Sequence, residues 1–325
     1  MSIAYSPPRG TSAPCFDAGS QYCPCDLAFL GQCVACSLIR GEEVCRCGWS
    51  GLCVYQEFTR RKHAVPARRE LLAHVLSRTD LPAPPGQEGA FVLELALPDR
   101  TASWCVFPGS FVMLRPPKSP DRFNVPISVM QVRDESVTVA VEVRGPKTIA
   151  LSRASKTGDR VTVIAPYWSG LQGSASLRRY SGGRVLVIAK GIGQAPALNA
   201  AFYVLSHGGY LKALLGSGLI GEVFVDDLLR SEGAAVEVLP RSKDHNLARF
   251  YSELCSGGYD LLISEGSDQQ HRALVGLLAS MDSPPAFAWS SNLTMTCAEG
   301  ICGSCLHSGL RGCKASLAAE QALSL

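Results

Sequence analysis

Four cysteines near the C-terminal end of the chain have the residue type and the spacing of metal ligands. Cys297, Cys302 and Cys305 stand at C-x4-C-x2-C spacing, and Cys313 follows after seven residues. This spacing is typical of plant-type [2Fe–2S] sites, in which three thiolates come from one short loop and a fourth comes from further along the chain. Small residues in the loop let backbone N–H groups point at the sulfurs. The pattern predicts a [2Fe–2S] centre, with structural zinc as the alternative.

A second group of cysteines falls between residues 15 and 53, with C-x-C spacing twice and C-x2-C once. Its members are Cys15, Cys23, Cys25, Cys33, Cys36, Cys45, Cys47 and Cys53. So short a segment buries little core, and we expect metal ligation to supply its fold. Two four-thiolate sites would use all of these thiols. At least one iron–sulfur cluster, a [4Fe–4S], is favoured, and a pair of structural zinc sites is the alternative.

Composition restricts the class of protein. The chain has 325 residues, 46% hydrophobic and 18% charged, which is enough for two or three domains with real cores. The formal net charge of +3 is too small to indicate a nucleic-acid or membrane partner. We find no secretory signal pattern and no run of 18 apolar residues, so we expect a cytoplasmic protein. In a reducing cytoplasm, 14 cysteines indicate metal ligands and not disulfides. Cys105 and Cys255 stand alone and are interpreted as packing residues.

Hydrophobic periodicity outlines the elements that must position these thiols. Leu71, Leu72, Val75 and Leu76 recur at helical spacing and predict a linker helix. Five short β-branched segments between residues 87 and 165 predict a small antiparallel barrel. Strands and helices then alternate, which predicts a doubly wound parallel α/β domain. The expected α+β multidomain order is a Cys-rich metal unit (1–60), a linker helix (61–84), a barrel (85–180), an α/β domain (181–290) and a C-terminal cysteine module (291–325).

A glycine turn opens the predicted α/β domain. The apolar strand 183–190 ends in Gly191-Ile192-Gly193, and a helix follows with Pro196 near its start. Glycines let a diphosphate approach the backbone, and a helix N-terminus offers free N–H groups and a positive dipole end. The third glycine of the dinucleotide fingerprint is missing, so a plain tight turn between strand and helix remains the alternative.

The order of barrel, strand–GxGxAP–helix and C-x4-C-x2-C resembles the ferredoxin–NADP reductase superfamily. Within it, the chain is similar to the electron-transfer subunit of dihydroorotate dehydrogenase and to the small subunit of electron-bifurcating NADH-dependent ferredoxin:NADP oxidoreductase. The resemblance covers roughly residues 85–320 and leaves the N-terminal cysteines outside. It implies FAD on the barrel and a nicotinamide nucleotide, NAD(P)H, on the α/β domain.

The resemblance implies a first FAD segment of the type R-x-Y/I-S on the barrel. The residues that match it are Pro126, Ile127 and Ser128. Val125 stands where the family usually has an arginine that binds the flavin phosphate. Arg122, three residues earlier, is the candidate substitute.

The resemblance also implies a second FAD segment, at Gly145, Lys147 and Thr148, where amides, an ammonium group and a hydroxyl would hold the pyrophosphate. An ordinary glycine turn is the alternative. Tyr167 and Trp168 lie in a loop that resembles the family's loop near the nicotinamide. They are interpreted either as stacking partners of a cofactor ring or as simple packing residues.

On the nucleotide side, the resemblance implies a phosphate turn made by Gly191, Gly193, Ala195 and Pro196. The family's CGP motif, close to the site of hydride transfer, reads Ser264-Glu265-Gly266-Ser267 here, so Gly266 is kept and the cysteine is missing. The residues expected at a 2′-phosphate are Arg241, Ser242 and Lys243. They favour NADPH over NADH, with a basic surface loop as the alternative. His307, inside the last cysteine loop, is interpreted as a tuner of the cluster or a surface residue, because a Rieske-type exchange needs two histidines.

The implied activity is that of an NAD(P)H-dependent flavin and iron–sulfur oxidoreductase. Flavin takes two electrons together and releases them singly, so no catalytic acid or base is required. The expected partner is a second flavoprotein or iron–sulfur oxidoreductase subunit in a hetero-oligomer, with a bifurcating complex as one form and ferredoxin as a further partner. The alternatives are a stand-alone NAD(P)H:ferredoxin reductase and a flavin- and zinc-binding redox sensor or assembly scaffold.

Overall fold

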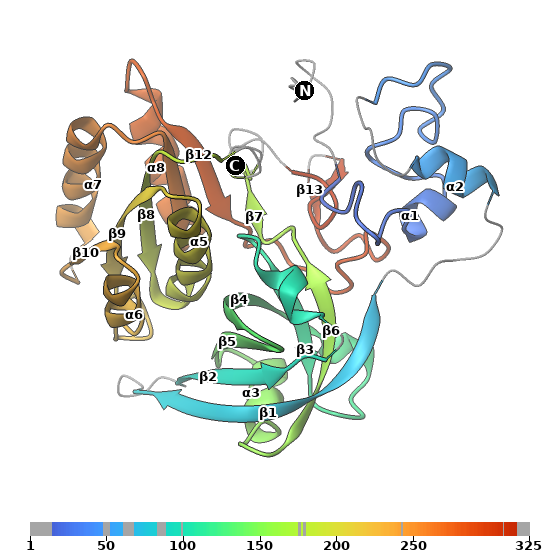
Figure 1. Cartoon of the computed structure of the whole chain (residues 1–325), viewed down its shortest axis with the longest axis horizontal. Coiled ribbons are helices and arrows are strands. Elements are labelled where there is room, and N and C mark those ends of the chain that lie inside the picture. The colour runs from blue at the N-terminus through green and yellow to red at the C-terminus, as the bar shows by residue number, and fades with distance from the viewer. Residues whose placement is uncertain are drawn as a thin grey trace.

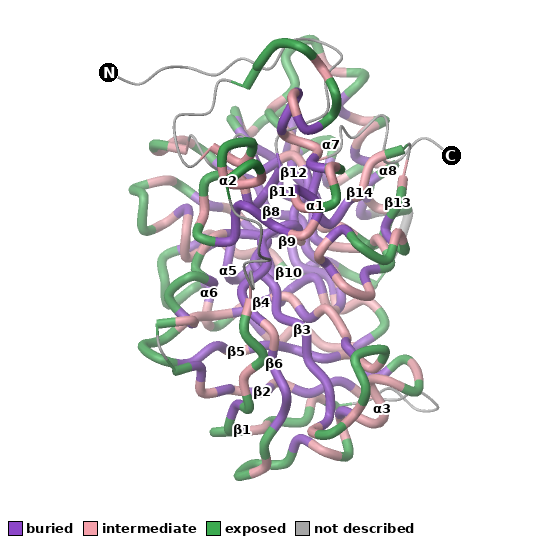
Figure 2. Tube along the Cα trace, turned by 90° about the vertical axis from the view of Figure 1, so that its right-hand side faces the viewer, coloured by how far each residue is buried: buried purple, intermediate pink, exposed green. Residues whose placement is uncertain are grey.

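The computed structural model of the chain describes residues 15–47, 53–60, 68–82, 89–98, 100–174, 177, 180–241, 243–307 and 309–316, without the side chains of 243–245. A barrel, an α/β domain and a cysteine-rich region lie around a common centre in Figure 1. The buried residues follow the strands of both domains (Figure 2).

Six antiparallel strands form a closed barrel in the order β1-β2-β5-β4-β3-β6. Their bounds are β1 (Arg69–Leu81), β2 (Ala90–Ala96), β3 (Phe111–Arg115), β4 (Val125–Arg133), β5 (Ser136–Glu142) and β6 (Arg160–Tyr167). Alternate residues such as Phe91, Leu93 and Leu95 are at most 1% exposed and fill the interior, as the period of a strand requires. Short helices accompany the barrel: η1 (Ala102–Cys105), η2 (Asp121–Phe123) and α3 (Pro146–Arg153). The prediction of an antiparallel barrel is confirmed.

The first barrel strand corrects the sequence analysis, because the linker helix predicted over 61–84 is wrong where the structure describes it. Arg69–Leu81 is strand β1, paired with both β2 and β6. Ala73 and Val75 point into the barrel, whereas Leu72 and Leu76 are about half exposed. The two exposed leucines produced an apparent helical period over a segment whose buried residues in fact alternate.

The α/β domain carries a six-stranded sheet in the order β10-β9-β8-β11-β12-β7, parallel except for β7 at its edge. Its strands are β7 (Leu171–Gln172), β8 (Arg184–Lys190), β9 (Tyr210–Gly216), β10 (Ala235–Val238), β11 (Leu261–Glu265) and β12 (Ala286–Ser290). Its helices are η3 (Gly191–Gly193), α5 (Gln194–Ser206), α6 (Asp226–Ser231), α7 (Lys243–Gly257) and α8 (Asp268–Ala279). One apolar core contains residues of α5 and α6, and the other contains residues of α7 and α8. The doubly wound prediction is confirmed.

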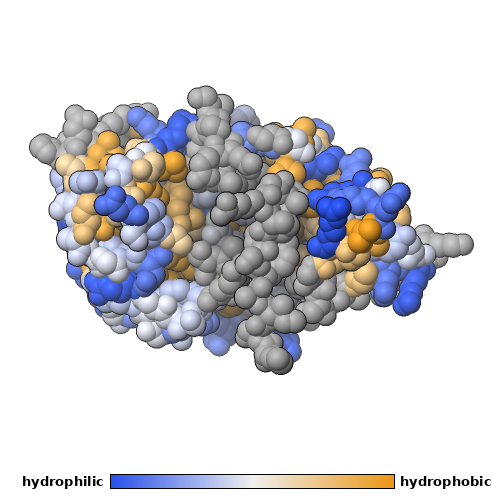
Figure 3. All heavy atoms as spheres, turned by 90° about the horizontal axis from the view of Figure 1, so that it is seen from above, coloured by the Kyte–Doolittle hydropathy of each residue, from blue (hydrophilic) through white to orange (hydrophobic). Residues whose placement is uncertain are grey.

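The two ends of the described chain lie side by side. The N-terminal unit, which we define as residues 15–47 and 53–60, contains α1 (Asp26–Phe29) and α2 (Val54–Arg60). It adjoins the C-terminal hairpin of β13 (Leu306–His307) and β14 (Leu310–Arg311) (Figure 1). From above, the end of the molecule formed by this unit shows hydrophobic next to hydrophilic surface (Figure 3). None of the helices that the structure describes is long and apolar enough to cross a membrane.

Candidate functional site

A cleft of about 970 Å³ separates the barrel from the α/β domain. The barrel wall is lined by Phe111, Val125, Pro126, Ile127, Ser128, Ala140, Glu142, Arg144, Thr148 and Gly170. The opposite wall combines the glycine turn after β8, the segments after β9 and β10, the start of α8 and residues 290–295. The carboxyl ends of β8, β9 and β11 all open on this cleft, which is where parallel α/β sheets bind ligands.

The first predicted flavin segment lies in the barrel wall of the cleft. Pro126, Ile127 and Ser128 belong to β4, which pairs with β3 so that Ser128 stands opposite Phe111. Arg122 is exposed on η2 and does not line the cleft. Arg144 does line it, next to β5, and its guanidinium contacts Glu142 at 2.9 Å. The structure therefore places a different arginine in the cleft from the one that the sequence suggested.

The second predicted flavin segment forms the start of α3. The Thr148 hydroxyl accepts hydrogen bonds from the amides of Arg144 and Gly145, at 2.9 and 3.1 Å, and so caps the helix. Lys147 donates to the Asn124 carbonyl at 3.3 Å. Thr148 lines the cleft, whereas Gly145 and Lys147 do not. This segment thus brings a helix N-terminus to the cleft but does not bring its lysine there.

The glycine turn after β8 is shaped by close backbone contacts. Gly191 has a φ of +60°, a conformation that glycine adopts without strain. A Cβ on Gly193 would lie 2.2 Å from the Glu265 carbonyl oxygen, so only glycine fits between η3 and the end of β11. Ala195 and Pro196, in the first turn of α5, line the cleft together with both glycines. All four predicted residues of the phosphate turn are therefore brought together.

A buried polar group lies behind this turn. Glu265 ends β11, is 1% exposed and has an Oε2 with no hydrogen-bond partner. Burial raises the pKa of this carboxyl to about 8, against a small lowering by a hydrogen bond from Ser290. Ser290 also accepts from the amide of Gly266 at 3.2 Å, and both residues line the cleft. A neutral acid therefore stands where the family motif has a cysteine.

Arg241 lines the cleft beyond β10, as predicted for a 2′-phosphate contact, and it is exposed. Ser242 and the side chain of Lys243 lie outside the described residues.

The aromatic pair Tyr167 and Trp168, at the end of β6, serves packing. Tyr167 stacks on Phe111 with ring centroids 5.0 Å apart and is 2% exposed. Trp168 donates from Nε1 to the Trp104 carbonyl at 2.8 Å and packs against Tyr22 of the N-terminal unit. Neither residue lines the cleft, so the packing interpretation is the one that the structure supports.

The four C-terminal cysteines stand as two pairs. The amides of Glu299 and Cys302 are directed at the Cys297 sulfur, at 3.4 and 3.5 Å. The Cys305 and Cys313 thiols are hydrogen-bonded to each other, which lowers the pKa of Cys305 to about 6. Burial raises the pKa of Cys302, but hydrogen bonds with Ser304 and Cys297 outweigh it and lower the value to about 7. Two pairs of thiols with converging amides match the donors of a two-iron centre.

The hairpin of β13 and β14 explains how the seven residues between Cys305 and Cys313 suffice to bring the two thiols together. Strands β13 and β14 pair Leu306 with Arg311, and the amide of Gly312 donates to the Cys305 carbonyl at 3.1 Å. The chain therefore reverses directly and returns Cys313 to Cys305. Across the described part of the chain, no three cysteine, histidine, aspartate or glutamate side chains already converge to metal-binding geometry.

One apolar cluster joins the cysteine loop to the cleft. It contains Cys305 and Cys313 together with Met295, Phe111 and Tyr167. Phe111 and Met295 also line the cleft. The cysteine pair is therefore packed against the same side chains that form the end of the cleft.

The N-terminal cysteines divide by exposure. Cys15, Cys23, Cys25, Cys33 and Cys36 are buried, Cys53 is partly buried, and Cys45 and Cys47 are exposed with their sulfurs 3.7 Å apart. All fourteen cysteines are free of disulfides. Burial raises the pKa of Cys23 to about 12 and also raises that of Cys33.

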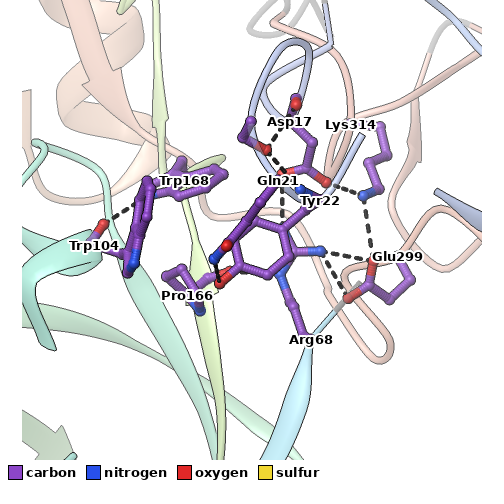
Figure 4. Close-up of polar contacts among 10 residues, drawn as sticks. Asp17, Gln21, Tyr22, Arg68, Trp104, Pro166, Trp168, Glu299 and Lys314 are labelled. Carbon is purple, nitrogen blue, oxygen red and sulfur yellow. Dashed lines mark hydrogen bonds and ion pairs between the residues drawn. The ribbon is translucent and has the colours of Figure 1, made fainter. Parts of the chain in front are cut away.

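A largely buried group of charges joins the two cysteine regions (Figure 4). Arg68 contacts Asp17 at 2.7 Å and Glu299 at 2.8 Å, and Lys314 contacts Glu299 at 3.2 Å and also Asp17. The Lys314 and Arg68 cations hold the pKa of Asp17 below its ordinary value, although burial raises it. We call Asp17, Arg68, Glu299 and Lys314 the charge joint. No sequence pattern marks it, because its members come from distant segments.

Comparisons with known proteins agree with this architecture. No family model matches the chain. It is 26% identical over 220 residues to the probable dihydroorotate dehydrogenase B (NAD(+)), electron transfer subunit, of Archaeoglobus fulgidus, covering 64% of this chain and 83% of that protein.

Two solved structures share the fold. The NADH-dependent reduced ferredoxin–NADP oxidoreductase, solved in a study of flavin-based electron bifurcation, matches with a TM-score of 0.58 and 20% identity over 75% of this chain and 90% of the other. The ferredoxin reductase in carbazole 1,9a-dioxygenase matches with a TM-score of 0.52 and 15% identity, over 70% of each chain. The chain thus has the fold of the ferredoxin–NADP reductase superfamily, and the resemblance found in its sequence is confirmed.

Proposed function

We propose that the chain is an NAD(P)H-dependent flavin electron-transfer protein that delivers single electrons through a [2Fe–2S] centre to a partner subunit. The observation that carries this proposal is the continuity between the cleft and the cysteine loop. Phe111 and Met295 line the cleft and belong to the apolar cluster that contains Cys305 and Cys313. The proposed sites for a two-electron donor and for a one-electron carrier would then be packed against the same side chains.

The barrel wall is the proposed seat of FAD, whose chemistry is to accept two electrons as a hydride and to release them singly. Ile127 offers an apolar surface for the flavin ring, and Ser128 offers a hydroxyl beside it. Arg144, in the same wall as Thr148, is the cation that would face a phosphate. Arg144 therefore takes the role that Val125 leaves open, in place of Arg122.

The opposite wall is the proposed seat of NAD(P)H. The free amides at the start of α5, beside Gly191 and Gly193, suit a diphosphate. Arg241 lies in the cleft wall beyond β10, where it would face a 2′-phosphate and favour NADPH. Gly266 and Ser290 also line the cleft, and they lie at the carboxyl ends of β11 and β12, so they would position the nicotinamide.

The C-terminal loop is the proposed [2Fe–2S] site. Cys297 and Cys302 would ligate one iron, and Cys305 and Cys313 would ligate the other, because the thiols already stand in these pairs. Amides that point at a sulfur stabilise the thiolate form and its metal complex.

A partner subunit is supported by the loop surface and by the relatives. Cys302 is exposed, and Ile301 and Leu306, near it in the chain, are 50% and 57% exposed. An apolar rim around an exposed ligand suits a contact with another protein. The Archaeoglobus relative is named as an electron transfer subunit, so we propose the same class of role here.

Anaerobic purification, followed by flavin, iron, sulfide and zinc analysis of one sample, tests the proposal. We expect about one FAD and at least about two irons with matching sulfide per chain. NADPH should bleach the flavin absorbance in the absence of oxygen, and the iron–sulfur signal should then appear by EPR. A chain without flavin, or with flavin that neither NADPH nor NADH reduces, would overturn it.

A matched pair of variants locates the centre. Cys305→Ser should remove the two-iron EPR signal and lower NADPH-driven reduction of a one-electron acceptor by about 100-fold or more, while the flavin is still bleached. Cys255→Ser, which changes an exposed cysteine on α7, should behave as the unaltered protein. Equal signals in both variants would place the iron elsewhere.

A further inference from the structure

The N-terminal unit is seated directly on the C-terminal cysteine loop. Leu27 of α1 packs so closely on Gly300 that a Cβ there would lie 2.4 Å from the Leu27 Cδ1 atom. Arg311 of β14 donates to the Gln32 side chain at 2.7 Å. The backbone of Cys15 forms a β-bridge with Ala315. The N-terminal unit therefore contacts the segment that carries the C-terminal thiols at three positions, Gly300, Arg311 and Ala315.

The charge joint fixes this seating. Asp17 comes from the N-terminal unit, Glu299 from within the C-x4-C segment and Lys314 from the residue after Cys313. Arg68, just before β1, also lies 4.1 Å from the ring centroid of Tyr167. Charges buried to this degree are stable only while all partners are present, so the unit and the loop hold one relative position.

Four buried thiols of the N-terminal unit lie around α1. Cys23 and Cys25 precede the helix, and Cys33 and Cys36 follow it, each between 5% and 7% exposed. The backbone amides of Ala35 and Cys36 are hydrogen-bonded to the Cys33 sulfur. A C-x2-C turn with amides directed at its first sulfur is the local geometry of a metal knuckle, and the Cys297 sulfur receives amides in the same way.

We propose that Cys23, Cys25, Cys33 and Cys36 hold a second redox centre, an iron–sulfur cluster, through which electrons from the C-terminal centre pass to the partner. The inference rests on the proposed function, because the C-terminal centre supplies its electrons.

The serial arrangement favours iron over zinc. The cleft adjoins the C-terminal loop through Phe111 and Met295, and the same loop adjoins the N-terminal unit through Gly300 and Leu27. A structural zinc site would not need to be held against a redox loop, whereas an electron carrier must be. In balance, NAD(P)H and two oxidised one-electron acceptors of the partner give NAD(P)⁺, one proton and two reduced acceptors.

Metal analysis and EPR of the full-length chain, purified without oxygen, test the inference. We expect about six irons per chain, two at the C-terminal loop and four at the new site, and little zinc. After reduction with dithionite, two neighbouring paramagnetic clusters should broaden and split each other's EPR signals. Two irons together with about one zinc per chain would overturn the inference and leave the proposed function intact.

A double variant assigns the ligands. Cys33→Ala with Cys36→Ala should lose about four irons, keep FAD and two irons, and give an unsplit [2Fe–2S] spectrum, whereas Cys255→Ala should match the unaltered protein. Unchanged iron content in the double variant would overturn the assignment. If the double variant does not fold, the iron, zinc and EPR results of the unaltered chain still decide. An unaltered chain that holds four irons but contains neither FAD nor the two-iron signal would instead contradict the proposed function.

Discussion

Buried carboxyl groups are treated differently in two regions of the molecule, the charge joint and the cleft. In the charge joint, Asp17 and Glu299 each pair with both Arg68 and Lys314, within 3.2 Å. Behind the cleft, Glu265 is equally buried, yet its Oε2 has no hydrogen-bond partner. A fully paired set fixes the parts that it connects, because losing any member strands the others. An unpaired acid instead stays neutral, and its surroundings remain sensitive to pH. The charge joint therefore holds two parts of the chain in a fixed position, whereas the protonation of Glu265 responds to pH.

The largest expected effect comes from breaking the joint. Asp17→Ala leaves two buried cations, Arg68 and Lys314, to share the Glu299 carboxylate, and we expect a loss of about 3–5 kcal/mol in the free energy of unfolding, measured by urea denaturation. Since the pKa of Asp17 is lowered in the folded chain, its contribution is present at neutral pH and is lost as the pH falls below the ordinary value of 3.8. Asp121→Ala removes an exposed partner of Arg115 and should cost less than about 1 kcal/mol. Equal costs would refute the distinction.

The unpaired acid gives the next effect, with pH as the variable. The pKa of Glu265 is raised to about 8, so the folded chain keeps a proton that the unfolded chain releases near pH 4.5. Stability should therefore decline between about pH 4.5 and 8 and level off above, by a few kcal/mol at about 1.4 kcal/mol per pKa unit. Glu265→Gln should abolish this decline. Glu237→Gln, whose carboxylate pairs with Arg249, should retain it. A decline of the same size in the Glu265→Gln variant and in the unaltered chain would argue against a neutral Glu265.

Two glycines of the C-terminal cysteine loop distinguish the steric from the electrostatic contribution to the contact between this loop and the N-terminal unit. Gly300 and Gly303 have nearly the same φ, +76° and +75°, but only Gly300 faces Leu27. Both alanine variants bear the strain of a positive φ, about 1 kcal/mol, and Gly300→Ala should cost about 1–3 kcal/mol more. Combining it with Leu27→Ala should make the two costs less than additive. Thermal unfolding of the unaltered chain, of the single variants Gly300→Ala, Gly303→Ala and Leu27→Ala, and of the double variant provides the measurement. Identical costs at both glycines would show that α1 does not press on the loop.

The smallest effect concerns Arg241, an exposed charge of the cleft that contrasts with the buried charges of the joint. Arg241→Ala should raise the KM for NADPH about 10-fold and leave the KM for NADH unchanged, because only NADPH carries a 2′-phosphate. Steady-state rates with both nucleotides measure this. A parallel rise for both would mean that Arg241 does not read the phosphate.

Local patterns predicted most of the fold. The strands of the barrel and the βα turn at Gly191 follow from period and spacing, and so does the grouping of the four C-terminal cysteines. Strand β1 escaped prediction because Leu72 and Leu76 face outward, so the segment carries more leucine than its one buried face requires. The position of a strand within a closed barrel is set by its neighbours, which a local window does not contain.

Two features of the site could not be read from the chain. Arg144 and Arg122 are both arginines beside a predicted flavin segment, and only the fold of the barrel decides that Arg144 lines the cleft. The charge joint combines residues up to 297 positions apart, and no periodicity connects such positions. The buried acid behind the cleft did leave a signal in the sequence. At the end of β11, Glu265 stands at the position where the resemblance implies a cysteine.

The contact between Asp17 and Lys314 has a consequence for the order in which the protein is made. The first of these residues is synthesised 297 positions before the second. At about 5–20 residues per second, the N-terminal unit waits about 15–60 seconds for the surface on which it rests. During that interval Leu27 and Asp17 lack the C-terminal residues that contact them in the folded chain. A chain that ended at Cys313 would lack the Lys314 partner of Asp17 and the Ala315 bridge to Cys15, so its N-terminal unit would be held by fewer contacts.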